Sequence, residues 1–233
     1  MPRLAVRRGG AANVPPMTEP SFLGPIRIGY DRIADDYFKS FPAELPWQPM
    51  DSGMVTAFVE LVRAGGAGPV ADVGCGPGKL TDYLNCLGLN TFGIDLSPGM
   101  IEVARREYPD LRFEVGSMTA LDLPDASLGG VIAHFSIMHV PDEDLPGVFT
   151  GFHRVLAPGG HLFVAFQTGD EHRVRTEAYG HEVSIAYELR PPERVAGLLS
   201  DAGFAMKATL VREPYAEWEK APRAYLLARK PEA

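Results

Sequence analysis

The sequence predicts an α/β fold in which strands and helices alternate along the chain. The central observation is the stretch Val70 to Lys79, where a short apolar strand runs into glycines at positions 74, 76 and 78. Leu80, Leu84 and Leu87 follow at helical spacing. Further apolar strands and amphipathic helices alternate toward the end of the chain. A strand, a glycine turn and a helix in this order form the nucleotide-binding opening of many α/β proteins.

Two helices and a loop are predicted before this stretch. Tyr30, Ile33, Ala34 and Tyr37 share one face of a helix predicted over residues 28–40. Prolines in residues 41–49 predict a loop, and a second helix follows from about residue 51. Residues 1–20 are rich in Arg, Gly, Ala and Pro, so we expect a disordered tail there and a single domain over residues 21–233.

The glycine turn, defined here as residues 74–78, does not match two common phosphate-binding loops. The G-x-x-x-x-G-K-[ST] loop needs a glycine and a hydroxyl residue where this chain has Val73 and Leu80. The dinucleotide fingerprint G-x-G-x-x-G needs a small residue where this chain has Lys79. The pattern from Asp72 to Gly78 is instead D-x-G-x-G-x-G.

Six further strands are predicted after the turn. The first, residues 89–95, ends in Asp95, which lies 21 positions after Gly74. That is the usual distance for a carboxylate that binds ribose hydroxyls. The remaining strands are expected over residues 111–115, 128–135, 162–166, 206–213 and 223–230. Residues 167–190 interrupt this rhythm and are expected to be an insert.

Four motifs resemble those of class I S-adenosylmethionine-dependent methyltransferases. They are Asp72 to Gly78 (motif I), Thr91 to Pro98 (second strand with its acid), Arg112 to Met118 (third strand) and Arg154 to Leu162 (R-x-L-x-P-G-G turn). They occur in the family's order, and the resemblance extends over roughly residues 30 to 230. It implies the family's Rossmann-like α/β fold, a seven-stranded mixed sheet with helices on both faces. It also implies methyl transfer from S-adenosylmethionine to an oxygen, nitrogen or carbon nucleophile of a small molecule, such as a natural product or quinone, with S-adenosylhomocysteine as product.

The resemblance implies a cofactor site around the glycine turn. In this interpretation Asp95 binds the ribose, and Leu96 and Met100 contact the adenine. Ser117 stands where the family usually has Asp, so the backbone N–H of Met118 is expected to assist. The complete set of cofactor residues implied is Tyr30, Asp72, Gly74, Cys75, Gly76, Gly78, Asp95, Leu96, Met100, Ser117, Met118 and His134.

Three histidines are candidates for proton transfer, because imidazole titrates near neutral pH. His134 and His139 follow the predicted strand 128–135, whose carboxyl end is where α/β sheets bind ligands. His181 lies in the insert. A base is needed only if the nucleophile of the acceptor must lose a proton. The resemblance implies a lid role for the helix 28–40, and acceptor contacts from Tyr37, His139, His181 and Tyr187.

Composition limits the remaining functional classes. The net charge of −8 disfavours a nucleic-acid-binding surface. Cys75 and Cys86 have no metal-ligand spacing, and no apolar run is long enough for a membrane span. We therefore expect a cytoplasmic protein, monomeric or homodimeric, without a metal. Two alternatives remain open: an NAD(P) oxidoreductase, and a protein that binds S-adenosylmethionine or S-adenosylhomocysteine without catalysis.

Overall fold

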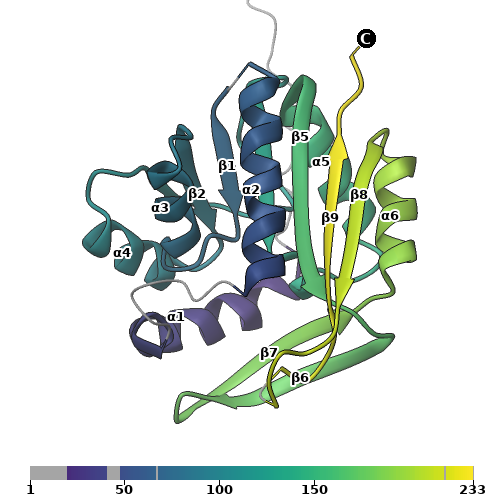
Figure 1. The fold of residues 1–233 in the computed structure, drawn as a ribbon. Helices are drawn as coiled ribbons and strands as arrows, with labels where there is room; N and C mark the ends of the chain where they lie inside the picture. Colours follow the sequence, from purple (N-terminus) through teal and green to yellow (C-terminus); the bar gives the residue numbers. More distant parts are fainter. Residues whose placement is uncertain (1–19, 41–47, 67, 218, 233) are drawn as a thin grey trace, which may run out of the picture.

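A seven-stranded sheet forms the centre of the molecule, with the strand order β3-β2-β1-β4-β5-β9-β8 (Figure 1). The computed structural model describes residues 20–40, 48–66, 68–217 and 219–232, so all of the expected tail except Pro20 lies outside the described residues. Strands β1 to β5 run parallel, whereas β9 is antiparallel to both of its neighbours. The predicted mixed sheet is confirmed. Its strands are β1 (Val70–Val73), β2 (Thr91–Asp95), β3 (Phe113–Val115), β4 (Leu128–His134), β5 (Leu156–Gln167), β8 (Ala205–Arg212) and β9 (Arg223–Arg229).

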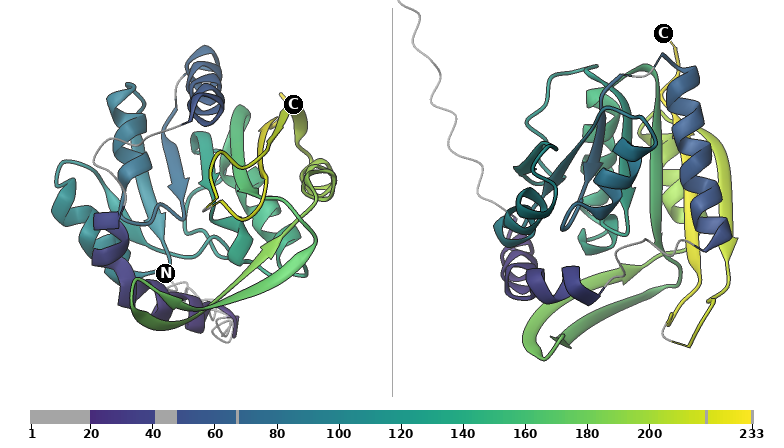
Figure 2. Two further views of the ribbon diagram at one scale, coloured as in Figure 1. Left: turned by 60° about the horizontal axis from the view of Figure 1, so that its bottom comes forward. Right: turned by 60° about the vertical axis from the view of Figure 1, so that its left-hand side comes forward.

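Helices cover both faces of the sheet (Figures 1 and 2). Helices α2 (Pro49–Ala64) and α3 (Lys79–Cys86) pack on one face, and α5 (Leu145–Val155) and α6 (Pro192–Asp201) on the other. Phe58 of α2 and Phe163 of β5 are fully buried, with ring centroids 5.9 Å apart. Each such side chain stabilises the fold by about 1.5–3 kcal/mol. Because helices bury both faces, the central strands are almost continuously apolar rather than alternating.

Two elements outside this sandwich cross the carboxyl edge of the sheet. The lid helix is α1 (Leu23–Ser40), and the insert hairpin consists of β6 (Glu171–Ala178) and β7 (His181–Leu189). They lie together beneath the sheet (Figures 1 and 2). Gly29 allows this contact, since a Cβ there would lie 2.6 Å from Cγ1 of Ile185. The lid helix and the insert hairpin therefore form one cover over the ends of the strands.

Several predicted bounds differ from the structure. The lid helix begins at Leu23 rather than near residue 28, and the fifth strand begins at Leu156 rather than at residue 162. The fourth strand ends at His134, because Phe135 adopts a positive φ of 52°. The insert 167–190 forms a hairpin for which the sequence predicted no strands. Its first strand is mostly polar and exposed, so it lacks the apolar alternation of a half-buried strand.

A buried arginine anchors the end of the insert hairpin. The Arg190 guanidinium donates to Asp142 Oδ1 at 2.6 Å and to the backbone carbonyls of Ile137 and Val140. These carbonyls flank a single 3₁₀ turn, η1 (Ile137–His139), which follows β4. A buried charge is tolerated when its donors are satisfied in this way. The contact fixes the position of η1 relative to the hairpin.

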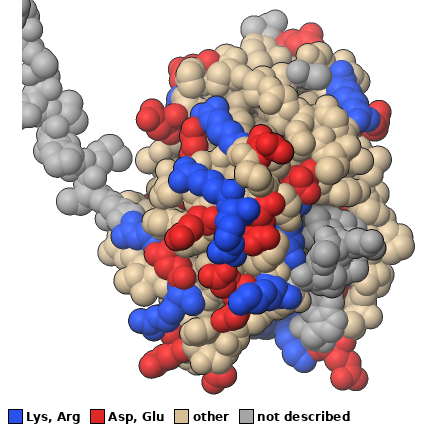
Figure 3. Space-filling view, turned by 90° about the vertical axis from the view of Figure 1, so that its left-hand side faces the viewer, with Lys and Arg blue, Asp and Glu red and all other residues tan. Residues whose placement is uncertain are grey.

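Charges of both signs are interspersed on the face that carries α1 and α4 (Pro98–Glu107) (Figure 3). Arg106 of α4 pairs with Asp35 of the lid helix at 2.8 Å, and Arg112 pairs with Glu114 at 2.6 Å. Pairs this exposed contribute little to stability. Among the described helices, none combines the length and the apolar character needed to cross a membrane.

Candidate functional site

The glycine turn connects β1 to α3 at the carboxyl edge of the sheet. Gly74, Gly76 and Gly78 all have positive φ, at 80°, 53° and 85°. A Cβ at Gly74 would lie 2.2 Å from Cβ of Ser136, and one at Gly78 would lie 2.7 Å from the ring of Phe113. A Cβ at Gly76 would meet nothing within 4 Å. The backbone at Gly76 is therefore open to a ligand, whereas the other two glycines are required by close packing.

Asp95 lies against this open backbone at the end of β2. Its Oδ2 accepts a hydrogen bond from the Gly76 N–H at 2.8 Å, and its Oδ1 accepts one from the Ser97 N–H at 2.8 Å. Burial raises the pKa of this carboxyl to about 6. A carboxylate has about four acceptor positions, so two remain available for a ligand's hydroxyl groups. Ser97, rather than Asp95, caps α4 by accepting from the Met100 N–H.

Asp72 lies beneath the glycine turn and is almost completely buried. Its Oδ2 accepts from the Thr81 hydroxyl at 2.7 Å, whereas its Oδ1 has no hydrogen-bond partner among the described residues. Burial raises the pKa of this carboxyl to about 7. A buried acceptor without a partner costs free energy unless a ligand satisfies it. Burial also raises the pKa of the neighbouring Cys75 thiol, so this cysteine stays protonated.

The remaining predicted cofactor residues surround the turn to different extents. The Met118 side chain lies over it, with Cε 3.6 Å from the position of a Cβ at Gly74. Ser117 is half-buried, and its hydroxyl forms a hydrogen bond with the Thr119 hydroxyl at 2.8 Å. Leu96 is half-buried beside Asp95. Met100 is buried in a cluster beneath the lid helix, so its contact there is with α1.

The three candidate histidines lie in three different places. The ring of His134 stacks on Phe163 at 6.3 Å between centroids, and burial lowers its pKa to about 3. His139, in η1, forms a hydrogen bond with Tyr30 of the lid helix at 2.8 Å. His181 lies 3.0 Å from Asp36, a contact that ties the insert hairpin to the lid helix. The structure therefore joins two predicted residues, His139 and Tyr30, that are 109 positions apart.

The two predicted acceptor tyrosines also belong to the cover. Tyr37 is half-buried, and its ring makes edge contacts with Tyr30 and Tyr179 at 6.3 and 5.9 Å between centroids. Tyr187 is half-buried in β7, directly opposite Arg173 of β6. The lid helix and the insert hairpin thus present aromatic and polar groups on the side of the cofactor residues.

Sequence reasoning missed two residues of this region. Asp31 follows Tyr30 and accepts hydrogen bonds from the Ser97 hydroxyl at 2.5 Å and the Gly99 N–H at 2.8 Å. A carboxylate is favoured at the positive end of a helix. The sequence marks the start of α4 by Ser97 and Pro98, but it does not show which carboxylate lies there. Phe135 has a strained backbone and lies under the Arg223 guanidinium, 4.8 Å from its ring centroid. No sequence pattern marks that position.

A surface hollow lies away from the glycine turn. It has a volume of about 440 Å³ and lies between the lid helix and β7, with Ile28, Arg32 and Ser184 in its wall. A smaller hollow is lined by Asp142, Glu171, His172 and Glu188. Neither contains a residue of the glycine turn or Asp95. We place the site at the turn because the convergent polar groups are there.

Comparison with known proteins shows which class of protein this chain resembles. Residues 70–160 match the family described as "Methyltransferase domain". Over these residues the chain is similar to class I methyltransferases, and S-adenosylmethionine is the cofactor of this class. The resemblance inferred from the sequence is confirmed.

Individual relatives extend this comparison. Demethylmenaquinone methyltransferase of Chlorobaculum parvum is 31% identical over 137 residues, covering 58% of this chain and 54% of that protein. Trans-aconitate 2-methyltransferase of Rhizobium meliloti is 38% identical over 103 residues, covering 42% and 38%. The chain thus spans about half the length, or less, of these curated relatives.

Solved structures confirm the fold over nearly the whole chain. The 1,6-didemethyltoxoflavin-N1-methyltransferase of Burkholderia thailandensis was solved with 1,6-didemethyltoxoflavin and S-adenosylhomocysteine bound. It superposes with a TM-score of 0.67 at 19% identity, covering 94% of this chain and 93% of that one. At this identity the likeness establishes the fold alone.

The residues present fit S-adenosylmethionine. The open backbone at Gly76 admits a ligand, and the adjacent Asp95 carboxylate has acceptor positions for ribose hydroxyls. The unsatisfied Asp72 Oδ1 is suited to an ammonium group such as that of the methionine portion. The N-terminal end of α3 (Lys79–Cys86) points its positive helix dipole at this region, which favours an anionic group.

Proposed function

We propose that this chain transfers a methyl group from S-adenosylmethionine to an oxygen, nitrogen or carbon nucleophile of a small-molecule acceptor. The observation that carries the proposal is the pairing of the open backbone at Gly76 with the Asp95 carboxylate at 2.8 Å. The names of the relatives, which include a demethylmenaquinone and a trans-aconitate methyltransferase, support a small acceptor.

In this proposal, different residues bind the methyl donor and the acceptor. Bound S-adenosylmethionine supplies a methyl group on a positively charged sulfur, which an in-line nucleophile can displace. Asp95, Gly76 and Asp72 hold the donor. The lid helix and the insert hairpin cover the carboxyl edge of the sheet, so Tyr37, His181 and Tyr187 are positioned to contact an acceptor. Holding two reactants close together and aligned can supply about 7–11 kcal/mol of the barrier reduction.

Titration calorimetry tests the cofactor first. We expect the protein to bind S-adenosylmethionine and S-adenosylhomocysteine and not to bind NAD(P)H. Binding of NAD(P)H alone would contradict the methyltransferase proposal and indicate an oxidoreductase. Transfer of a labelled methyl group to a small molecule then separates the enzyme from a protein that only binds the cofactor.

A further inference from the structure

His139 has hydrogen-bond partners on both ring nitrogens, each from a different element. Its Nε2 lies 2.8 Å from the Tyr30 hydroxyl of the lid helix, and its Nδ1 lies 2.8 Å from the Ala186 carbonyl of β7. A carbonyl oxygen only accepts, so Nδ1 carries the proton and donates it to Ala186. In a neutral imidazole, Nε2 is then an acceptor. The Tyr30 hydroxyl therefore donates to His139, and the phenol oxygen keeps its lone pairs for another donor.

Both members of this pair are neutral near pH 7. Burial lowers the pKa of His139 to about 4, and the nearby Arg175 lowers it further, against the contribution of the Ala186 carbonyl. Burial raises the pKa of Tyr30 above its usual value. The charged and titratable groups that face Tyr30 are Tyr37, Asp95, Arg175 and Tyr179. The next residue, Asp31, accepts from the Ser97 hydroxyl, and the Ser97 N–H donates to Asp95, so these contacts bring Tyr30 near the proposed ribose site.

We propose that Tyr30 and His139 form a proton relay that deprotonates a hydroxyl acceptor. This proposal rests on the proposed methyl transfer. Tyr30 is the catalytic residue that touches the acceptor, and His139 acts through it. Tyr30 and His139 are both half-buried, so they border the site rather than lying within the core. The Ala186 carbonyl and Arg190, which anchors η1, hold the imidazole in place.

The step balances in atoms and charge. The acceptor oxygen forms a bond to the methyl carbon as the bond from that carbon to sulfur breaks, and the electron pair of the broken bond stays on sulfur. The acceptor proton moves to the Tyr30 oxygen, and the Tyr30 proton moves to His139 Nε2. The positive charge lost from sulfur reappears on the imidazolium. Because the site gains no net charge, the burial that disfavours imidazolium in the free protein is offset during transfer.

The relay defines a class of acceptor. A phenol, a hydroquinone or an alcohol keeps its proton at neutral pH and needs a base, whereas a carboxylate is already ionised. We therefore expect a hydroxyl acceptor rather than a carboxylic acid. Naphthohydroquinone, kept reduced under argon, is the probe for the first class, and trans-aconitate is the probe for the second.

Labelled methyl transfer to both probes tests the relay with Tyr30→Phe and His139→Gln. The introduced glutamine side chain retains an acceptor and a donor but cannot take up a proton, so a merely structural role would survive this substitution. We expect the wild type to methylate the hydroquinone, and each variant to lose about 100-fold or more in kcat. The double variant should be no slower than either single one. His172→Gln, on the insert hairpin, and Tyr215→Phe, at an exposed position outside the cover, are the controls and should keep the wild-type rate.

Three results would overturn the relay: no transfer to the hydroquinone, wild-type rates in either variant, or losses that multiply in the double variant. The cofactor affinity of His139→Gln, measured in parallel, should change less than about threefold. If the wild type binds no S-adenosylmethionine, the proposed function itself fails, which is a different outcome.

Nitrogen-15 NMR of labelled histidines provides a test that is independent of any acceptor. With S-adenosylmethionine bound at pH 7, His139 should be neutral and protonated on Nδ1, and Tyr30→Phe should shift its Nε2 resonance. An imidazolium, or a proton on Nε2, would contradict the relay.

Discussion

Gly74 and Gly76 differ in what surrounds them, although both have positive φ. Gly74 is pressed against Ser136, which donates its hydroxyl to the Val73 carbonyl at 2.7 Å. Gly76 faces open space beside Asp95. We therefore expect the first glycine to be needed for folding and the second for binding, and substitutions should separate these two roles.

Gly76→Ala should fold and lose affinity for S-adenosylmethionine. An alanine at φ 53° costs about 1–2 kcal/mol, and its methyl group would occupy the space a ligand needs. Gly74→Ala should cost about 3 kcal/mol or more, because its Cβ overlaps Ser136. Thermal unfolding and calorimetry measure both effects, with Gly147→Ala, an open position in α5, as the neutral control. Equal behaviour of the two variants would contradict the assignment.

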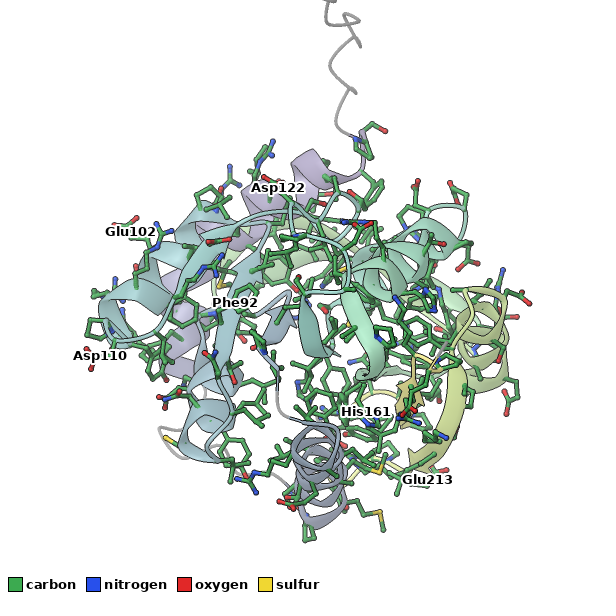
Figure 4. The ribbon with its side chains drawn as sticks, turned by 90° about the horizontal axis from the view of Figure 1, so that it is seen from above. Phe92, Glu102, Asp110, Asp122, His161 and Glu213 are labelled. Carbon is green, nitrogen blue, oxygen red and sulfur yellow. The ribbon has the colours of Figure 1, made fainter. Side chains whose placement is uncertain are left out.

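Asp95→Asn should weaken binding of S-adenosylmethionine by about 1.5–3 kcal/mol, because hydrogen bonds to a charged acceptor are lost. The amide keeps the size of the side chain but has one acceptor oxygen, so either the Gly76 or the Ser97 N–H loses its partner and the free energy of unfolding should also fall, by about 1–3 kcal/mol. Asp110→Asn is the matched control, since Asp110 lies exposed at the periphery of the molecule (Figure 4). Unchanged affinity in Asp95→Asn would remove this residue from the ribose site.

At the scale of elements, the lid helix is attached to α4 by Asp31. One carboxylate oxygen accepts from both Ser97 and Gly99, at the positive end of α4. The second attachment, between Asp35 and Arg106, is exposed on both sides. Asp31 makes two hydrogen bonds, one of them to the buried Ser97, so this attachment should control how firmly the lid helix is held.

Asp31→Ala should loosen the lid helix. Losing two hydrogen bonds to a charged acceptor should lower its opening free energy by about 1.5–3 kcal/mol. Hydrogen exchange of the amides in Leu23–Ser40 should accelerate, while the sheet stays protected. Asp35→Ala, which removes only an exposed pair, should have an effect of less than about 1 kcal/mol. If the two variants exchange alike, Asp31 is not the attachment.

The sequence predicted the sheet, the glycine turn and the carboxylate of Asp95, because each depends on local pattern and spacing. It did not predict the insert hairpin, whose strand β6 is exposed and polar. It named both Tyr30 and His139 but could not pair them, since their contact depends on packing between distant elements. It also could not show that His181 pairs with Asp36, which lies 145 positions away.

Over the whole molecule, two sets of buried groups give opposite pH dependences. The pKa of Asp72 is raised to about 7 and that of Asp95 to about 6. Between about pH 4 and 7 the folded chain binds more protons at these groups than the unfolded chain, so their contribution to stability falls as pH rises. The pKa values of His134 and His139 are lowered to about 3 and 4. Their contribution falls instead as pH drops below about 6.5.

Asp72→Asn should change the pH dependence of stability. At pH 8 the buried Asp72 carboxyl of the wild type is ionised, which destabilises the fold, whereas the amide stays neutral. The variant should therefore be more stable than the wild type at pH 8, and the difference should shrink toward pH 4. It should also bind S-adenosylmethionine more weakly, since the ammonium group loses its charged partner. Thermal unfolding at several pH values, with Asp110→Asn as the control, measures the effect. Equal destabilisation at every pH would contradict it.

The insert hairpin begins and ends almost at one point. It follows β5 after Gln167, and the Arg190 N–H donates back to the Gln167 carbonyl at 3.4 Å. The hairpin is therefore a closed detour that leaves the sheet and the glycine turn unchanged. It also lies outside the residues 70–160 shared with the methyltransferase-domain family. Exchanging this detour between homologous chains should therefore leave the sheet and the glycine turn intact.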